Sequence, residues 1–459
     1  MRDHLASRAL LPDGWADDVL LRVDDRGLLL EARAGATAPE ARRIPGVAVP
    51  GVPNLHSHAF QRALAGLTER TPSGGGGRDT FWSWRERMYA FLSRLGPEDV
   101  EAVATQLYVE LLRSGYTVVG EFHYLHHAPD GHPYGDPAEM SRRILAASRA
   151  AGIGLTHLPV LYMAGDFGGA PPGEAQRRFL LDVDGVLDLV ARCEAETAND
   201  PARRVGLALH SLRAVPPEAI EPAVAGLPGP SAPVHIHVAE QRREVEACLA
   251  WSGARPVEWL LDHADVDGRW CAVHATHVEA GEAARLAATG AVAGLCPTTE
   301  ANLGDGIFPL RPWLEAGGRF GVGSDSHVST SPVEELRWLE YAQRLRLEER
   351  NVAAGFPHPS TARSLLERAW AGGAAALGLP VGRLAAGHRA DWVALDPDHP
   401  ALVGRRDDDL LDAWIFSGAA NPVAEVVVGG RVRVEAGRHV DEDAVADRYR
   451  SVARRLVEG

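Results

Sequence analysis

The 459-residue sequence contains no lysine, so arginine supplies all 47 of its basic side chains. A Walker phosphate loop, a pyridoxal Schiff base and a carboxylated lysine that bridges two metals each require a lysine side chain. The sequence therefore excludes these three kinds of site.

Other features are also missing. No apolar run approaches the ~20 residues of a membrane helix, and Met1 to Arg8 lacks the apolar core of a secretory signal. The four cysteines are widely spaced without a C-x-x-C pair, which favours buried, reduced thiols over disulfides. The formal net charge of −15 argues against a nucleic-acid partner. We expect a cytoplasmic protein with neither a nucleic-acid nor a membrane partner.

Both ends of the chain have a β-like texture. Short apolar runs separated by turn residues occupy 18–23, 27–32, 390–396 and 422–432. This pattern predicts a small β-sandwich domain assembled from residues 1–49 and 381–459, with a terminal helix in the second part. The chain is long enough for two or three domains, and residues 50–380 form the expected remainder.

The middle of the chain alternates short apolar runs with longer amphipathic segments. Eight such runs predict strands: 44–52, 117–122, 154–161, 205–210, 234–237, 271–274, 292–296 and 319–323. Eight strand–helix alternations are typical of an α/β fold of the (β/α)8 TIM-barrel type, with functional residues at the carboxyl ends of the strands. The glycine-rich segment 72–78 is a candidate lid, although tolerated slack is the commoner reason for such a loop.

Histidines and one aspartate follow several of these runs. His56 and His58 are two residues apart, so a strand presents both on one face. With His237 and Asp325 they form a candidate set of ligands for one divalent metal. A lone histidine of this kind is usually a core residue, and Asp325 could instead cap the next helix. Their order, each at a strand end, favours the metal site.

Glu240 and His274 are left for proton chemistry. A carboxylate beside a metal-activated water can take its proton and return it to a leaving nitrogen. His274 can hold or polarise the attacking oxygen, and Asp325 joins both residues as a catalytic group. His235 and His277 are interpreted as core or supporting residues.

Together these residues resemble the amidohydrolase superfamily, in the branch that deaminates C=N carbons with one metal. That branch has no carboxylated lysine on its fourth strand, and here His210 ends the corresponding run. The chain is more closely similar to the formimidoylglutamate deiminase family. That similarity rests on segments 54–62, 81–89, 121–127, 208–215 and 296–306.

This resemblance implies a barrel of the amidohydrolase type and hydrolysis of N-formimidoyl-L-glutamate to N-formyl-L-glutamate and ammonia, a step of histidine degradation. It also implies a homodimer. A single divalent metal per chain is expected; zinc suits mixed nitrogen and oxygen ligands, but iron, manganese and cobalt stay open.

A substrate with two carboxylates favours two separated arginine clamps, because a planar guanidinium binds a carboxylate bidentately. Arg213 and Arg85 are the candidates by position. Gln61, Tyr124 and His210 complete the expected substrate-binding set.

Two alternatives remain at this point. An aminohydrolase of the same fold could act on an uncharged heterocycle such as guanine, a pterin or an adenosine derivative, which gives no reason for paired arginines. A barrel without enzymatic activity could serve as a binding or scaffold protein, but such a protein should lack a ligand or the general base. This sequence lacks neither.

Overall fold

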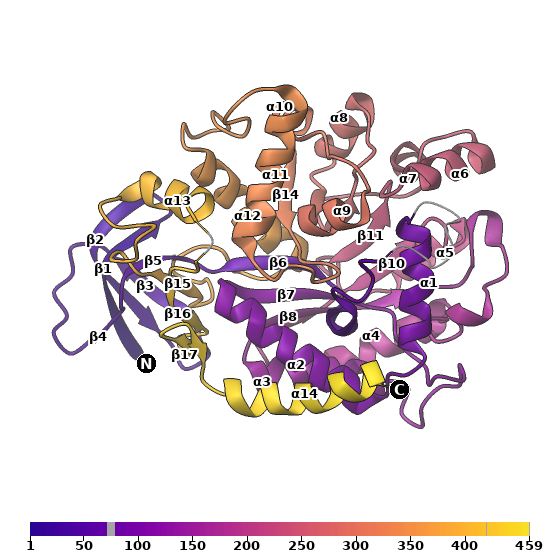
Figure 1. Ribbon diagram of the computed structural model, residues 1–459, viewed down its shortest axis with the longest axis horizontal. Helices are drawn as coiled ribbons and strands as arrows, with labels where there is room; N and C mark the ends of the chain where they lie inside the picture. The colour runs from indigo at the N-terminus through magenta and orange to yellow at the C-terminus, as the bar shows by residue number, and fades with distance from the viewer. Residues whose placement is uncertain (71–78, 419, 459) are drawn as a thin grey trace.

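The computed structural model describes residues 1–70, 79–418 and 420–458. The chain folds into a barrel, ringed by helices, and a second sheet that lies at one side of it (Figure 1). The glycine-rich segment at Ser73–Gly77 lies outside the described residues.

Eight parallel strands close the barrel, as the sequence predicts. The first of them is Val52–Ser57 and not the predicted run 44–52, because Val47–Pro50 pairs within the second sheet. Strand β14 pairs with β6, and β10 pairs with both β8 and β11. The fourth strand is split at Gly206, where an added Cβ would come within 2.5 Å of the Pro233 carbonyl oxygen. The strands are β6 (Val52–Ser57), β7 (Tyr116–His123), β8 (Gly154–Leu161), β9 (Arg203–Val205) with β10 (Leu207–Ser211), β11 (Val234–Val238), β12 (Trp270–His274), β13 (Val292–Leu295) and β14 (Arg319–Val322).

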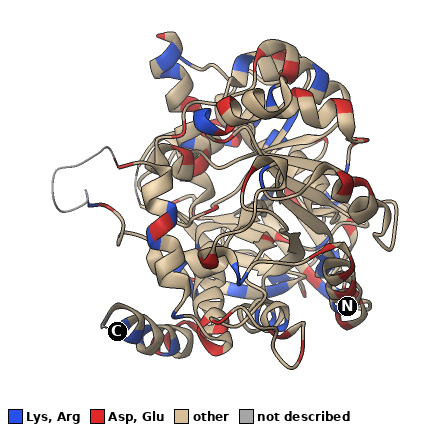
Figure 2. Ribbon diagram, turned by 90° about the vertical axis from the view of Figure 1, so that its right-hand side faces the viewer, with Lys and Arg blue, Asp and Glu red and all other residues tan. Residues whose placement is uncertain are grey.

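Helices follow the strands, and most of them cover the outside of the barrel, whereas α1 lies at the carboxyl end of the strands. They are α1 (Phe81–Leu92), α2 (Pro97–Ser114), α3 (Glu139–Ala151), α4 (Val183–Thr197), α5 (Pro217–Ala225), α6 (Arg242–Ser252), α7 (Pro256–His263), α8 (Ala280–Ala288), α9 (Pro297–Leu303), α10 (Leu310–Glu315), α11 (Pro332–Leu347) and α12 (Thr361–Leu377), with 3-10 turns η1 (Ala59–Leu64), η2 (Phe167–Gly169) and η3 (Glu174–Gln176). Most charged residues lie on these helices and on loops (Figure 2).

Local signals set the helix ends. In α2, Pro97 occupies the first turn, and the Asp99 carboxylate accepts from the Gly96 N–H at 2.9 Å. Gly115 ends the helix with φ 105°, a left-handed conformation that favours glycine. In α11, the Ser331 side chain accepts from the N–H of Glu334. These caps fix where the helices begin and end.

The second sheet combines both ends of the chain. Its order is β18-β17-β16-β15-β5-β1-β2-β3, with β4 paired to β1. The strands are β1 (Arg2–Leu11), β2 (Gly14–Val23), β3 (Leu29–Arg33), β4 (Arg42–Arg43), β5 (Val47–Pro50), β15 (Trp392–Leu395), β16 (Val423–Val428), β17 (Arg431–Glu435) and β18 (Arg438–His439). Strands β5 and β15 pair antiparallel and join the two ends.

The ladder is continuous, so the expected sandwich is one curled sheet. The turn at Gly27 meets the turn at Gly429, where an added Cβ on Gly27 would lie 2.9 Å from the Gly429 Cα. Side chains from both halves, including Leu21 and Val427, share one buried core. Curling lets a single sheet enclose that core, because each half covers the other.

The last elements are α13 (Asp407–Phe416) and α14 (Glu442–Glu458), and α14 runs beside α2 (Figure 1). An ion pair of 2.8 Å between Arg448 and Glu101 links α14 to α2.

The domain bounds 1–49, 50–380 and 381–459 stay a prediction. All four cysteines are free and buried. Across the described parts of the chain, no helix combines the length and the apolar character needed to cross a membrane.

Candidate metal centre and active site

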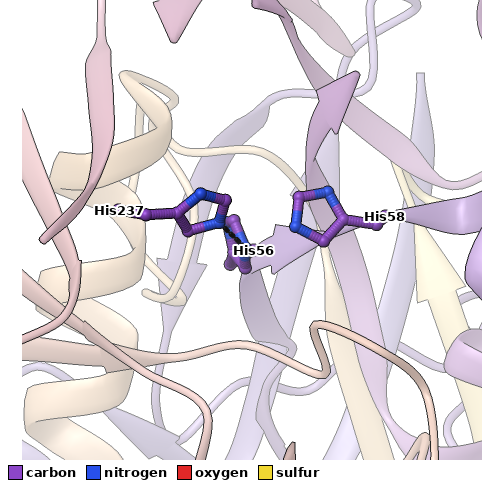
Figure 3. A group of neighbouring side chains, drawn as sticks. All are labelled: His56, His58 and His237. Atoms are coloured by element: carbon purple, nitrogen blue, oxygen red, sulfur yellow. Dashed lines mark hydrogen bonds between the residues drawn. The ribbon is translucent and has the colours of Figure 1, made fainter. Parts of the chain in front are cut away.

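The four predicted ligands meet at the carboxyl end of the barrel. His56 lies near the end of β6, His58 directly follows that strand, His237 is on β11, and Asp325 follows β14. The Nε2 atoms of His56 and His237 are 3.1 Å apart. The Asp325 Oδ1 lies 3.5 Å from the Nε2 of both His56 and His58. Figure 3 shows the three imidazoles pointing toward a common centre.

This donor set fits a divalent cation. Two imidazole nitrogens at ~2.05 Å from one tetrahedral metal lie roughly 3.3 Å apart, close to the observed spacing. The Nδ1 of His58 donates to the Phe122 carbonyl at 2.8 Å, and the Nδ1 of His237 donates to the His210 carbonyl at 3.0 Å. Both Nε2 lone pairs are thereby directed toward the centre. Burial lowers the pKa of His58 to about 3, so it stays neutral, as ligation requires.

Glu240 and His274 lie beside this centre. The Glu240 Oε1 is 3.7 Å from the His274 Nε2, which is 3.8 Å from the Asp325 Oδ2. Burial raises the pKa of Glu240 to about 7, although His274 partly opposes that effect. For His274, burial alone would lower the pKa, but the carboxylates of Glu240, Glu300 and Asp325 outweigh it and raise the pKa to about 10. A carboxylate that can exchange a proton near neutral pH thus faces a cationic imidazole.

Glu300, on α9, was not identified as a functional residue from the sequence. Its Oε1 lies 3.3 Å from the Nδ1 of His274 and accepts from the N–H of Cys296 at 3.0 Å. Glu300 therefore fixes the ring of His274 from behind. The carboxylate belongs to the 296–306 segment used for the resemblance, but no spacing rule connects it to His274.

A second carboxylate that the sequence did not reveal, Glu121 on β7, holds the chain around His58. It accepts from the Ser57 hydroxyl at 2.6 Å and from the Ala59 N–H at 2.7 Å. The Tyr108 hydroxyl donates to the same carboxylate at 3.1 Å. Residues on both sides of His58 are thus fixed by one buried group. The sequence does carry one signal for Glu121: it is a carboxylate inside an apolar strand run. Burying a carboxylate costs free energy unless hydrogen-bond donors or an opposite charge compensate it.

The hydrogen-bonded chain continues from β6 to β14. His327 lies between Ser57 and Ser324, with its Nε2 3.2 Å from the Ser57 Oγ and its Nδ1 3.0 Å from the Ser324 Oγ. Asn54 donates to the Ser324 Oγ at 2.6 Å. Since Ser57 donates to Glu121, its oxygen accepts from His327, which in turn accepts from Ser324. This ordered network ties the His56–His58 segment to the segment that carries Asp325.

The backbone at these strand ends is unusual. Ala239, His274, Ala275, Asp325 and His327 all have positive φ, between 46° and 68°. Two backbone bonds hold the Asp325 turn: its N–H donates to the His56 carbonyl at 3.0 Å, and its carbonyl accepts from the His58 N–H at 3.1 Å. Non-glycine residues rarely adopt this conformation without such support.

The five predicted substrate-binding residues line one cavity with the centre. Gln61 from η1, Arg85 from α1, and Tyr124, His210 and Arg213 at strand ends share it with His58, His237, Glu240, His274 and Asp325. Gln61 donates to the Tyr124 hydroxyl at 3.0 Å. Among the described residues, the buried Nε atoms of Arg85 and Arg213 have no hydrogen-bond partner. Both guanidinium groups thus retain donors for a ligand.

His235 and His277 do not line this cavity. The Nε2 of His235 donates to the Ala376 carbonyl at 2.8 Å, and that of His277 donates to the Asp305 carbonyl at 2.9 Å. The cavity walls also include aromatic side chains that the sequence did not single out, namely Phe81, Trp84, Tyr89 and Phe179. These rings exclude water around the polar groups and strengthen their interactions.

Comparison with known proteins places this chain in a family. The model of the amidohydrolase family matches residues 47–433. The chain is 51% identical to the formimidoylglutamate deiminase of Pseudomonas aeruginosa over 453 residues, which covers 99% of each. A crystal structure of an amidohydrolase from Brucella melitensis is 48% identical, with a TM-score of 0.94 and full coverage of both chains. An adenosine deaminase from Xanthomonas campestris, solved with bound zinc, shares the fold at 20% identity, with a TM-score of 0.82 over 100% of this chain and 98% of that one. The chain belongs to the amidohydrolase family.

Proposed function

We propose that this protein hydrolyses the C=N bond of N-formimidoyl-L-glutamate and releases N-formyl-L-glutamate and ammonia. The observation that carries the proposal is the pair of guanidinium groups, Arg85 and Arg213, in the cavity that also contains Glu240 and His274. The 51% identity to a formimidoylglutamate deiminase over almost the whole chain supports the same substrate.

His56, His58, His237 and Asp325 would hold one divalent cation, which supplies a Lewis acid that makes water a nucleophile at neutral pH. The Glu240 carboxylate takes a proton from the water as its oxygen bonds to the formimino carbon. Glu240 returns that proton to the imino nitrogen. The remaining proton of the attacking oxygen then passes through Glu240 to the same nitrogen, so the carbonyl group forms as the C–N bond breaks and ammonia leaves. The His274 Nε2–H donates to the attacking oxygen, and Asp325 orients His274.

Arg213 and Arg85 bind the two carboxylates of the substrate through their N–H groups. Gln61, Tyr124 and His210 add neutral hydrogen bonds to the same ligand. An uncharged heterocycle would leave the buried Arg213 and the half-buried Arg85 without an anionic partner, which disfavours the purine or pterin alternative. The arrangement therefore selects a small dianion.

The finer features follow from the resemblance. We propose zinc because the donors are three imidazoles and one carboxylate, and we propose a homodimer that acts in histidine degradation. Four buried, free thiols are consistent with the reducing cytoplasm that we propose as its location. Metal analysis and gel filtration test the first two features.

The direct test is an ammonia-release assay on metal-loaded protein. N-formimidoyl-L-glutamate should be turned over, whereas guanine and adenosine should not. N-formimidoyl-L-aspartate, shorter by one methylene, tests the spacing between the two arginines. Preference for guanine or adenosine would favour the heterocycle deaminase instead.

A further inference from the structure

Trp82, in the first turn of α1, lies among three arginine side chains. The Cζ atoms of Arg85 and Arg243 are each 4.4 Å from the centre of its ring, and that of Arg213 is 5.7 Å away. Two of these arginines are the proposed carboxylate clamps. The third, Arg243, belongs to α6 and is not among the site residues that the sequence predicts.

The three cations come from separate parts of the barrel. Trp82 and Arg85 are on α1, Arg213 follows β10, and Arg243 is in the first turn of α6. Three guanidinium groups around one ring repel one another because they carry the same charge. The negative face of the indole ring attracts each of them. The Trp82 ring is thus a common contact that keeps the guanidinium groups close together.

We infer that Trp82 and Arg243 are positioning residues for dicarboxylate recognition. The Trp82 ring holds Arg85 and Arg213 at a fixed separation, and Arg243 holds the ring in place from α6. Neither Trp82 nor Arg243 lines the cavity, so both act through the clamps and not on the ligand. This inference rests on the proposed function, because it explains how the same site recognises its two carboxylates.

The physical reason is preorganisation. A guanidinium must meet a carboxylate in a defined plane to form two parallel hydrogen bonds. An arginine that is already stacked loses less conformational entropy when the ligand binds. Arg243 is exposed, so its side chain can be changed without disturbing the core.

The first experiment compares Arg243→Met with Arg243→Lys. Methionine keeps an apolar side chain without charge, whereas lysine keeps the cation. Arg243→Met should raise the KM for N-formimidoyl-L-glutamate about two- to fivefold, the range that an exposed cation–π contact supports, with kcat nearly unchanged. Arg243→Lys should recover most of the loss. Arg242→Met, which removes the neighbouring exposed arginine, is the matched control and should stay near wild type.

A double-mutant cycle shows whether Arg243 acts through the ring. In the background of Trp82→Leu, the effect of Arg243→Met should vanish, since the contact is already lost. A long-range attraction between Arg243 and a dianion would instead persist there. Trp82→Phe replaces Trp82→Leu if the leucine variant folds poorly. Calorimetric binding of N-formyl-L-glutamate should give the same pattern without turnover.

Three results would overturn the inference: an unchanged KM in Arg243→Met, equal losses in the methionine and lysine variants, or additive effects in the cycle. A wild-type protein that does not turn over N-formimidoyl-L-glutamate would overturn the proposed function itself. Normal wild-type turnover with an unaffected Arg243→Met variant would overturn the positioning role alone.

Discussion

Replacing Arg213 with methionine tests the dicarboxylate site most directly. The side chain is only 6% exposed, and its Nε has no hydrogen-bond partner among the described residues. In the complex, the variant would leave one desolvated carboxylate of the substrate without a partner. That situation costs about 2–5 kcal/mol, which corresponds to a fall of roughly 30- to 5,000-fold in kcat/KM at 1.36 kcal/mol for each factor of ten.

The loss should depend on the substrate. An analogue that lacks the carboxylate bound by Arg213 should be a poor substrate of the wild type and lose little further in Arg213→Met. Ammonia release measures both rates, and metal content, measured by elemental analysis, should not change because Arg213 is not a proposed ligand. The reasoning is refuted if Arg213→Met processes N-formimidoyl-L-glutamate normally, or if both substrates lose activity equally.

A second consequence concerns pH. Burial raises the pKa of Glu240, and the positive charge of Arg213 is among the groups that oppose this rise. Removing that charge should raise the pKa of Glu240 further. The acidic limb of the kcat/KM profile should therefore move to higher pH in Arg213→Met. An acidic limb that moves to lower pH in the variant would show that the charge of Arg213 does not lower the pKa of Glu240.

Four further predictions concern the centre. Glu240→Gln should retain metal while kcat falls by about two orders of magnitude or more. Near-normal kcat in this variant would exclude Glu240 as the base. In the wild type, kcat/KM should fall as the pH drops through about 7, where Glu240 gains a proton. Chelation should abolish activity and one equivalent of divalent metal per chain should restore it, whereas a requirement for two equivalents would contradict a mononuclear site. Glu121→Gln should weaken metal affinity about 10- to 100-fold, as changes around metal ligands commonly do; unchanged affinity in a chelator competition would show that Glu121 does not position His58.

The barrel could be predicted because its signal is local. Each strand is a short apolar run, and the proposed ligands lie at the ends of such runs, so parallel strands bring His56, His237 and Asp325 to one end. The supporting network could not be predicted in this way. Glu121 and Ser57 are 64 residues apart, and Ser57 and His327 are 270 apart. Their contacts depend on strand register and side-chain direction, which no single segment specifies.

The second sheet and the cavity mouth show the same limit. Strand texture at both ends of the chain predicted a shared β domain, but the pairing of β5 with β15 that makes it one curled sheet is a contact across more than 300 residues. Arg213 could be selected by its place after the fourth strand. Arg243 could not, because only the approach of α6 to Trp82 distinguishes it from other exposed arginines.

The left-handed backbone at the strand ends makes the rim that carries the proposed active site a locally strained part of an otherwise well-packed barrel. For a residue with a Cβ, this conformation costs about 1–2 kcal/mol, and five such residues lie at the rim. The summed free-energy cost at this rim is therefore comparable with the whole free energy of unfolding of many domains. Substitutions that relieve this backbone strain should raise the thermal stability of the protein, and they should lower its turnover.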